Sequence, residues 1–334
     1  MPEKLNLPAR PRRNRRNEAI RSLVRETSLV PADLIYPLFV HDKTVDEEIA
    51  SMPGCKRWGL EGLLGEVGEA RDAGVRAVVL FPAIEEVLKT SDAKECHNKE
   101  GLVPRVLEAL KSAYPDMAVI TDVALDPYNS DGHDGIVVKN DQGEPEILND
   151  ETVAVLCQQA LCHARAGADV VSPSDMMDGR VGEIRGALDD EGFEDVLIMS
   201  YTAKYASAYY GPFRGALESA PKAGDKKTYQ MDPANWREAL REAELDVMEG
   251  ADIIMVKPAG PYLDVIRVLR ESLDLPMAAY QVSGEYLMIK SAVAAGWIDE
   301  EAVVMESLLG IKRAGADMIL TYFAKMVAER LSAG

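Results

Sequence analysis

Short apolar runs alternate with longer amphipathic stretches along the chain. Eight of these runs have the length and the Val, Ile, Leu and Ala content of buried strands: residues 34–40, 77–83, 117–125, 168–174, 196–204, 251–259, 276–282 and 316–323. The stretches between them show helical periodicity, most clearly at 150–166, 178–191, 234–249 and 300–313. This order predicts a regular alternation of strands and helices.

The expected strands are apolar almost throughout, unlike the strands of a half-exposed sheet. Such strands, separated by helices, are typical of a parallel sheet that is covered on both faces. The tripeptide Gly-Ala-Asp opens three of them, at 167, 250 and 315, where glycine suits the end of the preceding helix. Eight such units predict an α/β protein with a closed (β/α)8 TIM barrel over 31–334 and an extended N-terminal arm over 1–30.

Composition disfavours two classes of partner. No apolar stretch approaches the roughly 20 residues needed to cross a bilayer, so we expect no membrane association. The formal net charge of −19 disfavours binding to nucleic acid, which requires a basic surface. The first residues lack the apolar core of a secretory signal peptide, and we therefore expect a cytoplasmic protein.

The arm carries a basic run that contrasts with the acidic chain: Arg10, Arg12, Arg13, Arg15 and Arg16. One interpretation is an arm that binds nucleic acid. The other is a segment that docks on the acidic surface of another subunit, and the charge asymmetry favours this one. The sequence thus predicts a homo-oligomer.

Two lysines, Lys204 and Lys257, stand at the ends of apolar strands. Burial there would disfavour the charged ammonium and leave a neutral amine able to attack a carbonyl, which is the first step of Schiff-base catalysis. Pro258 ends the second of these strands, because proline cannot donate to a sheet ladder. A single lysine in this setting is more often ion-paired or extended toward solvent. Two in equivalent settings favour the catalytic interpretation.

Other polar residues end the remaining strands, among them Asp122, Asp126, Ser174, Asp175, Ser283 and Tyr322. Each alone could serve as a cap or turn residue, but in a TIM barrel all would meet at the rim that carries active sites. The connection 205–233 is long enough for an active-site lid. Its cations include Arg214 and Lys226, which suit a substrate carboxylate, although a solvated basic loop is an equal alternative.

Four segments resemble the motifs of the porphobilinogen synthase family, also called 5-aminolevulinate dehydratases: SYTAKYASAYYGPFR, MVKPAGPYLDVIR, QVSGEY and LTYFAK. The resemblance covers nearly the whole chain. It implies a hydro-lyase of tetrapyrrole (haem, chlorophyll, cobalamin) biosynthesis that condenses two molecules of 5-aminolevulinate to porphobilinogen. By the resemblance, Lys257 forms the Schiff base with the substrate that becomes the propionate side, and Lys204 with the substrate that becomes the acetate side.

The resemblance also implies roles for the rim residues. Ser283 and Tyr322 would bind the carboxylate of the first substrate, and Asp122 and Ser174 would contact its amino end. Arg214, Lys226 and Gln230 would bind the carboxylate of the second substrate. The stretch 205–233 would be the lid that excludes water from the imines, and the working assembly would be an octamer built from dimers that embrace through their arms.

The chain differs from the zinc-dependent members of the family at the residues that would bind the metal. The three cysteine positions of their loop correspond here to Ala124, Asp126 and Asp134, so we expect no catalytic zinc. Asp126 and Asp134 could hold a hard cation such as Mg²⁺. Glu242 matches a glutamate linked to an allosteric Mg²⁺ site, although any one acid on a helix as acidic as this is usually solvated.

Two other hypotheses stay open. A different lysine-dependent barrel enzyme, such as a class I aldolase, would explain one Schiff-base lysine but gives no reason for the second. A barrel retained as a binding scaffold would explain the fold but not the set of polar groups at its rim.

Overall fold

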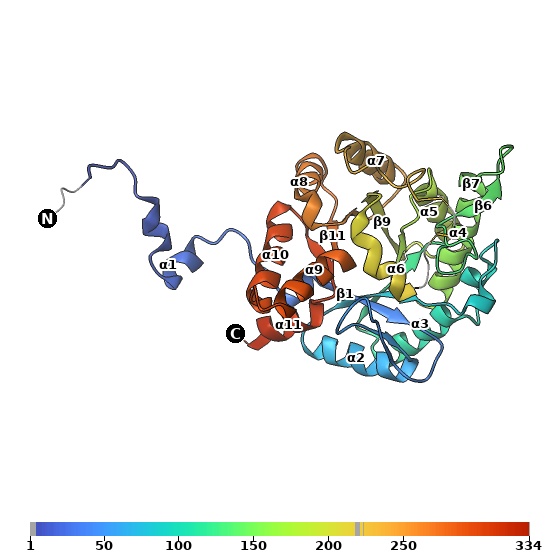
Figure 1. Cartoon of the computed structure of the whole chain (residues 1–334), viewed down its shortest axis with the longest axis horizontal. Helices are drawn as coiled ribbons and strands as arrows, with labels where there is room; N and C mark the ends of the chain where they lie inside the picture. The colour runs from blue at the N-terminus through green and yellow to red at the C-terminus, as the bar shows by residue number, and fades with distance from the viewer. Residues whose placement is uncertain (1–4, 218–220, 223, 334) are drawn as a thin grey trace.

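The computed structural model describes residues 5–217, 221–222 and 224–333, and it confirms the barrel (Figure 1). Eight parallel strands follow one another in chain order around it: β1 (Leu34–Val40), β4 (Ala77–Pro82), β5 (Ala118–Val123), β8 (Val170–Pro173), β9 (Leu197–Lys204), β10 (Ile253–Lys257), β11 (Met277–Gln281) and β12 (Met318–Thr321). The sheet closes where β12 pairs with β1, with Leu34 opposite Ile319. All eight strands expected from the apolar runs are present.

Helices surround the barrel: α2 (Leu60–Asp72), α3 (Leu102–Ala113), α4 (Asn149–Arg165), α5 (Arg180–Asp190), α7 (Arg237–Met248), α8 (Leu263–Ser272), α10 (Glu300–Ala314) and α11 (Ala324–Ala333). The four clearest expected helices correspond to α4, α5, α7 and α10. Two more helices, α6 (Gly211–Leu217) and α9 (Ser283–Ala294), follow β9 and β11. Apolar residues fill both the barrel interior and the layer between strands and helices, which is the burial that the continuous apolar strands predict.

Glycine ends the helices that precede the Gly-Ala-Asp strands. Gly250 and Gly315 have φ values of 97° and 136°, a region that residues with a Cβ rarely adopt. A Cβ on Gly315 would also come within 2.7 Å of Arg270 Cβ. The repeated tripeptide therefore marks the turn from helix to strand, as expected.

Two hairpins were not evident from the apolar pattern. β2 (Glu47–Glu48) and β3 (Lys56–Trp58) extend the sheet beside β1, where Phe39 pairs with Arg57. β6 (Ile136–Lys139) and β7 (Pro145–Leu148) form a separate two-stranded sheet in the connection after β5. Both hairpins are short and partly exposed, so they lack the apolar runs that reveal the barrel strands.

The N-terminal arm lies outside the barrel (Figure 1). It contains a short 3-10 turn, Pro11–Arg15, and the helix α1 (Glu18–Leu23), and neither has a buried residue. Residues 1–4 of the expected arm fall outside the described residues, and its role in assembly stays a prediction. Within the described residues, none of the helices combines the length and the apolar character needed to cross a membrane.

Candidate active site

The two lysines are neighbours across paired strands. Lys204 ends β9, Lys257 ends β10, and the two residues are register partners in the sheet. Both side chains are buried and line one cavity at the carboxyl end of the barrel strands. The other residues that line this cavity are Phe81, Asp122, Asp126, Asp134, Ser174, Tyr210, Phe213, Arg214, Lys226 and Gln230.

Aromatic rings surround the amine of Lys257. Its Nζ lies 4.8 Å from the ring centroid of Tyr280 and 4.9 Å from that of Tyr201. The rings of Tyr210 and Phe213 are each 5.2 Å away. Burial, reinforced by the nearby charge of Lys204, lowers the pKa of Lys257 to about 7. A large fraction of this amine is therefore neutral at physiological pH and able to attack a carbonyl.

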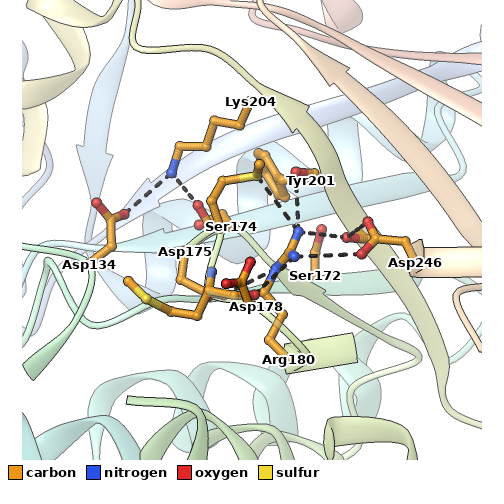
Figure 2. A network of polar contacts seen from close by, with 12 residues as sticks. Asp134, Ser172, Ser174, Asp175, Asp178, Arg180, Tyr201, Lys204 and Asp246 are labelled. Atoms are coloured by element: carbon orange, nitrogen blue, oxygen red, sulfur yellow. Dashed lines mark hydrogen bonds and ion pairs between the residues drawn. The ribbon is translucent and has the colours of Figure 1, made fainter. Parts of the chain in front are cut away.

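The amine of Lys204 has polar partners instead. Its Nζ lies 3.3 Å from Asp134 Oδ1 and donates a hydrogen bond to the backbone carbonyl of Ser174 (Figure 2). These two acceptors come from the connection after β5 and from the end of β8. They fix the position of the amine within the cavity.

Asp134 joins Lys204 to the loop 205–233. Lys226 Nζ lies 2.7 Å from Asp134 Oδ2 and 3.5 Å from Asp126 Oδ2, and the Tyr229 hydroxyl donates to Asp134 Oδ2 at 2.9 Å. Burial opposes the ionisation of Asp134, but the charges of Lys204 and Lys226 outweigh it and hold its pKa well below the usual range. Asp134 is thus a carboxylate shared by two ammonium groups.

This arrangement bears on the expected cation at Asp126 and Asp134. The ammonium of Lys226 lies between the two carboxylates, where a cation bound by both would lie. Within the described part of the chain, no group of three or more His, Cys, Asp and Glu side chains is placed to hold a metal ion. The donor set as arranged here does not fit a metal, and the ligand role of these two residues stays a prediction.

Asp122 and Ser174 stand on the wall of the same cavity. Asp122 Oδ1 has no hydrogen-bond partner among the described residues. Burial, followed by the charge of Asp126, raises the pKa of Asp122 to about 7. A carboxyl group that titrates near neutral pH can take up and return protons during a reaction.

Ser283 and Tyr322 lie behind α6 and do not line the cavity. The Phe213 N–H donates to Ser283 Oγ at 3.0 Å. The Tyr322 hydroxyl lies 2.9 Å from that of Tyr280, and the ring of Phe39 contacts the rings of both Tyr322 and Phe213. The structure thus brings together every expected substrate ligand except these two, because Phe213 fills the space in front of them.

The helix α6 covers the cavity as the described part of the expected lid. Arg57, next to the barrel edge, donates to the carbonyls of Ala216 and Gly215 at 2.5 and 2.9 Å, and Ser51 Oγ donates to Pro212 O at 2.8 Å. The cavity beneath has a volume of about 30 Å³, close to the space of one water molecule. We therefore expect α6 to move when a molecule larger than water enters. Residues 218–220 and 223 of the expected lid lie outside the described residues.

Sequence reasoning missed the aromatic side of the site and the residues that hold the lid. Tyr201, Tyr210 and Phe213 stand within the lysine motif itself, so aromatic residues at positions −3, +6 and +9 from Lys204 were the available signal. Arg57 gave no signal, because its contact with α6 joins segments about 160 residues apart and only the fold brings them together.

Glu242 lies on α7, away from the lysines. It lines a second cavity, of about 710 Å³, together with Asp178 and Glu238, and Gln230 lines both cavities. Burial raises the pKa of Glu242, while the charge of Arg180 opposes this shift. The residue is therefore a half-buried acid in an acidic surrounding, and its expected link to Mg²⁺ stays a prediction.

Comparison with known proteins gives a consistent match. The family model "Delta-aminolevulinic acid dehydratase" matches residues 8–330. The chloroplastic delta-aminolevulinic acid dehydratase of Physcomitrium patens is 61% identical over 330 residues, which cover 98% of this chain and 76% of that protein. The chloroplastic delta-aminolevulinic acid dehydratase 1 of Arabidopsis thaliana is also 61% identical. That match covers 98% of this chain and 75% of the Arabidopsis protein.

A solved structure agrees with the sequence matches. The delta-aminolevulinic acid dehydratase of Toxoplasma gondii, in complex with the reaction product porphobilinogen, has a TM-score of 0.95 and 56% identity. The match covers 98% of this chain and 92% of that one.

One expectation is wrong by these comparisons. The curated relatives are named chloroplastic, which contradicts the expected cytoplasmic location. That expectation rested on the lack of an apolar secretory core, and chloroplast transit peptides are not recognised by such a core. The matched residues and the identity over nearly the whole chain show that the chain belongs to the delta-aminolevulinic acid dehydratase family.

Proposed function

We propose that the protein condenses two molecules of 5-aminolevulinate to porphobilinogen with release of two water molecules, using Lys257 and Lys204 as the amines that form imines. Membership of a family of hydro-lyases carries the overall reaction. The observation that carries the assignment of the amines is their placement as register partners in one buried cavity.

The chemistry of each amine follows from its surroundings. The neutral amine of Lys257 attacks the ketone of one substrate, and loss of water gives an imine. Lys204, held by Asp134 and the backbone carbonyl of Ser174, forms an imine with the second substrate in the same way. Each iminium withdraws electrons from the neighbouring carbon, which permits removal of a proton there and formation of the carbon–carbon bond. Asp122, which titrates near neutral pH beside both lysines, is the group best suited to carry these protons.

The substrate carboxylates require cations and hydroxyl donors. Arg214 and Lys226 supply two cations at the cavity, and Gln230 supplies an amide, which supports their assignment to the second substrate. Ser283 and Tyr322 become available to the first substrate when α6 and Phe213 move. In this proposal α6 is the lid, and its return excludes water from the imines.

The test is to incubate the protein with 5-aminolevulinate, to measure porphobilinogen by its chromogenic reaction, and to map the borohydride-reduced adducts by mass spectrometry. Product together with adducts on Lys257 and Lys204 supports the assignment. Product without an adduct on either lysine would contradict the two-imine route.

The same proposal includes a regulatory Mg²⁺ at Glu242. A half-buried carboxylate beside further acids, on the wall of a large cavity, suits a hard cation that keeps several water ligands. After chelation, added Mg²⁺ should raise the turnover of the native protein. A Glu242→Gln variant that responds to Mg²⁺ as the native protein does would remove Glu242 from this role.

The arm is proposed to hold an oligomer together, up to the octamer that the resemblance implies. Its residues Leu5 and Leu23 are 71% and 80% exposed, and a neighbouring subunit would cover such apolar side chains. Deletion of residues 1–30 should lower the molecular mass measured by analytical ultracentrifugation. An unchanged mass would show that other surfaces hold the assembly.

A further inference from the structure

The strand β9 contains one more residue than its partner β10 along their shared length. Ser200 pairs with Ile254, and Ala203 pairs with Val256. On β10 only Met255 lies between Ile254 and Val256, so Tyr201 and Thr202 of β9 both stand opposite this one residue. This arrangement is a β-bulge. The bulge ends at Thr202, two positions before Lys204.

This bulge decides which way Lys204 points. Side chains alternate between the two faces of a regular strand, so Tyr201 and Lys204, three positions apart, would lie on opposite faces. In the structure both face the barrel interior, where the amines of Lys204 and Lys257 lie 6.0 and 4.9 Å from the ring centroid of Tyr201. Ser200 faces outward, and its Oγ donates to Asp246 Oδ2 on α7 at 2.6 Å. If the same residues formed a regular strand with no bulge, Lys204 would lie on the face opposite Tyr201 and point away from Lys257.

Arg180, the first residue of α5, holds the bulged part of the strand. It is 2% exposed, and its Nη2 donates to Ser200 Oγ at 3.1 Å and to the Tyr201 carbonyl at 3.4 Å. Figure 2 shows Arg180 beside Tyr201 and Asp246. The residue pairs that join β9 to β8, Val170 with Leu197 and Val171 with Ile198, lie nearer the start of the strand. The guanidinium thus binds Ser200, which precedes the bulge, and Tyr201, which is the first residue of the bulge.

Two buried carboxylates fix the guanidinium in turn. Asp246 Oδ1 lies 3.5 Å from Arg180 Nη1, and Asp175 Oδ2 lies 3.8 Å from Nε. Asp175 follows Ser174, whose backbone carbonyl accepts the hydrogen bond from Lys204. The Arg180 cluster, defined as Arg180, Asp175, Asp246 and Ser200, therefore adjoins both the strand that carries Lys204 and the carbonyl that receives its amine (Figure 2).

We propose that Arg180 is a positioning residue for Lys204: by holding the bulge in β9 it turns this amine into the cavity, and it does so without touching the substrate. The inference rests on the proposed function, in which Lys204 forms an imine. It separates the two lysines, because the bulge precedes Lys204 on β9 and Lys257 lies on β10.

The test compares Arg180→Lys with Arg185→Lys. Arg185 stands on the same helix and donates to the carbonyls of Val196 and Phe193, remote from the bulge, so it is a matched control. Each protein is mixed with 5-aminolevulinate, quenched with borohydride within one turnover, and digested to measure the adducts on Lys204 and Lys257 separately. Lysine keeps the buried charge at 180 but not the planar fork. We expect the Lys204 adduct to fall about tenfold or more, as for a lost hydrogen bond to a charged group, with the Lys257 adduct within about twofold of native.

Each outcome bears on the proposal. Equal Lys204 adducts in a folded Arg180→Lys variant and the native protein would overturn it, as would a parallel loss of both adducts. If that variant does not fold, Ser200→Ala removes one contact of the guanidinium while leaving the charges, and it should lower the ratio of Lys204 to Lys257 adduct. An unchanged ratio there would equally overturn the role. A native protein that forms no adduct on Lys204 would instead overturn the proposed function, and this role with it.

Discussion

Lys204 and Lys257 are register partners on adjacent strands, yet their amines have opposite surroundings. Lys257 lies among aromatic rings, while Lys204 is held by Asp134 and the carbonyl of Ser174. Two identical substrate molecules enter this site, so the protein itself must supply the asymmetry of the reaction. The different surroundings of the two amines provide it, and Lys257, whose pKa burial lowers to about 7, is the amine ready to react first.

The first prediction concerns replacement of Lys257 by methionine, which should abolish product formation. The same change should raise the free energy of unfolding at pH 7 by a few kcal/mol, because the native state holds this amine in an apolar site that disfavours its charge. Chemical denaturation monitored by circular dichroism measures the effect. Lys204→Met is the contrasting control, since it removes the ion pair with Asp134 and should lower stability.

The pH dependence of this stability difference has a defined sign. The folded pKa of Lys257 is about 7, below that of the unfolded chain at about 10.4. Between these values the unfolded state binds the extra proton, so the native protein gains stability from this residue as pH rises from about 7 to about 10. The methionine variant should lack that gain. An advantage of the variant that stays constant across this window would contradict the lowered pKa.

The second prediction concerns the rate of imine formation at Lys257, which should rise with pH through about 7 as the amine loses its proton. The carboxylate of Asp122 favours the charged amine and the ammonium of Lys204 disfavours it. Asp122→Asn should therefore move the midpoint to lower pH, and Lys204→Met should move it to higher pH, each by roughly half a unit or more. Borohydride trapping within one turnover measures this rate at each pH. Shifts of both variants in the same direction would contradict the assignment.

The barrel strands were predictable because each must bury both of its faces, which leaves a continuous apolar run in the sequence. The bulge in β9 leaves no such signal: Ser200, Thr202 and Lys204 are polar at alternate positions, a pattern that predicts a regular strand with Lys204 on the same face as Ser200. The direction of Lys204 therefore depends on pairing with β10, which the sequence of one strand does not contain.

The site was predictable where its residues follow strands and less so where they depend on the lid. Asp122, Ser174 and the two lysines lie on the cavity wall as expected. Ser283 follows β11 as expected, but its hydroxyl accepts a hydrogen bond from the N–H of Phe213 on α6. The position of α6 results from long-range contacts such as those of Arg57, and local patterns do not encode these.

The third prediction concerns the lid. Arg57→Ala removes two hydrogen bonds to carbonyls of α6, each worth about 0.5–1.5 kcal/mol, so residues 211–217 should open more often. Hydrogen exchange in this segment, followed by mass spectrometry, should become roughly fivefold or more faster. Arg105→Ala is the matched control, because Arg105 also binds two carbonyls, those of Glu100 and Gly101, outside the cavity. Equal acceleration of α6 in both variants would show that Arg57 does not hold the lid.

The fourth prediction concerns Ser283, which can serve the lid and the substrate together. A hydroxyl accepts and donates at once, so after α6 has returned over the substrate, Ser283 Oγ can again accept the N–H of Phe213 while donating to a substrate carboxylate. Ser283→Ala loses both contacts, and a hydrogen bond to a charged group is worth about 1.5–3 kcal/mol. The KM for 5-aminolevulinate should rise about tenfold or more, and exchange in α6 should accelerate. Ser291→Ala, an exposed position on the same helix, should change neither. Faster exchange in Ser283→Ala with an unchanged KM would leave Ser283 as an anchor of the lid alone and remove it from the substrate ligands.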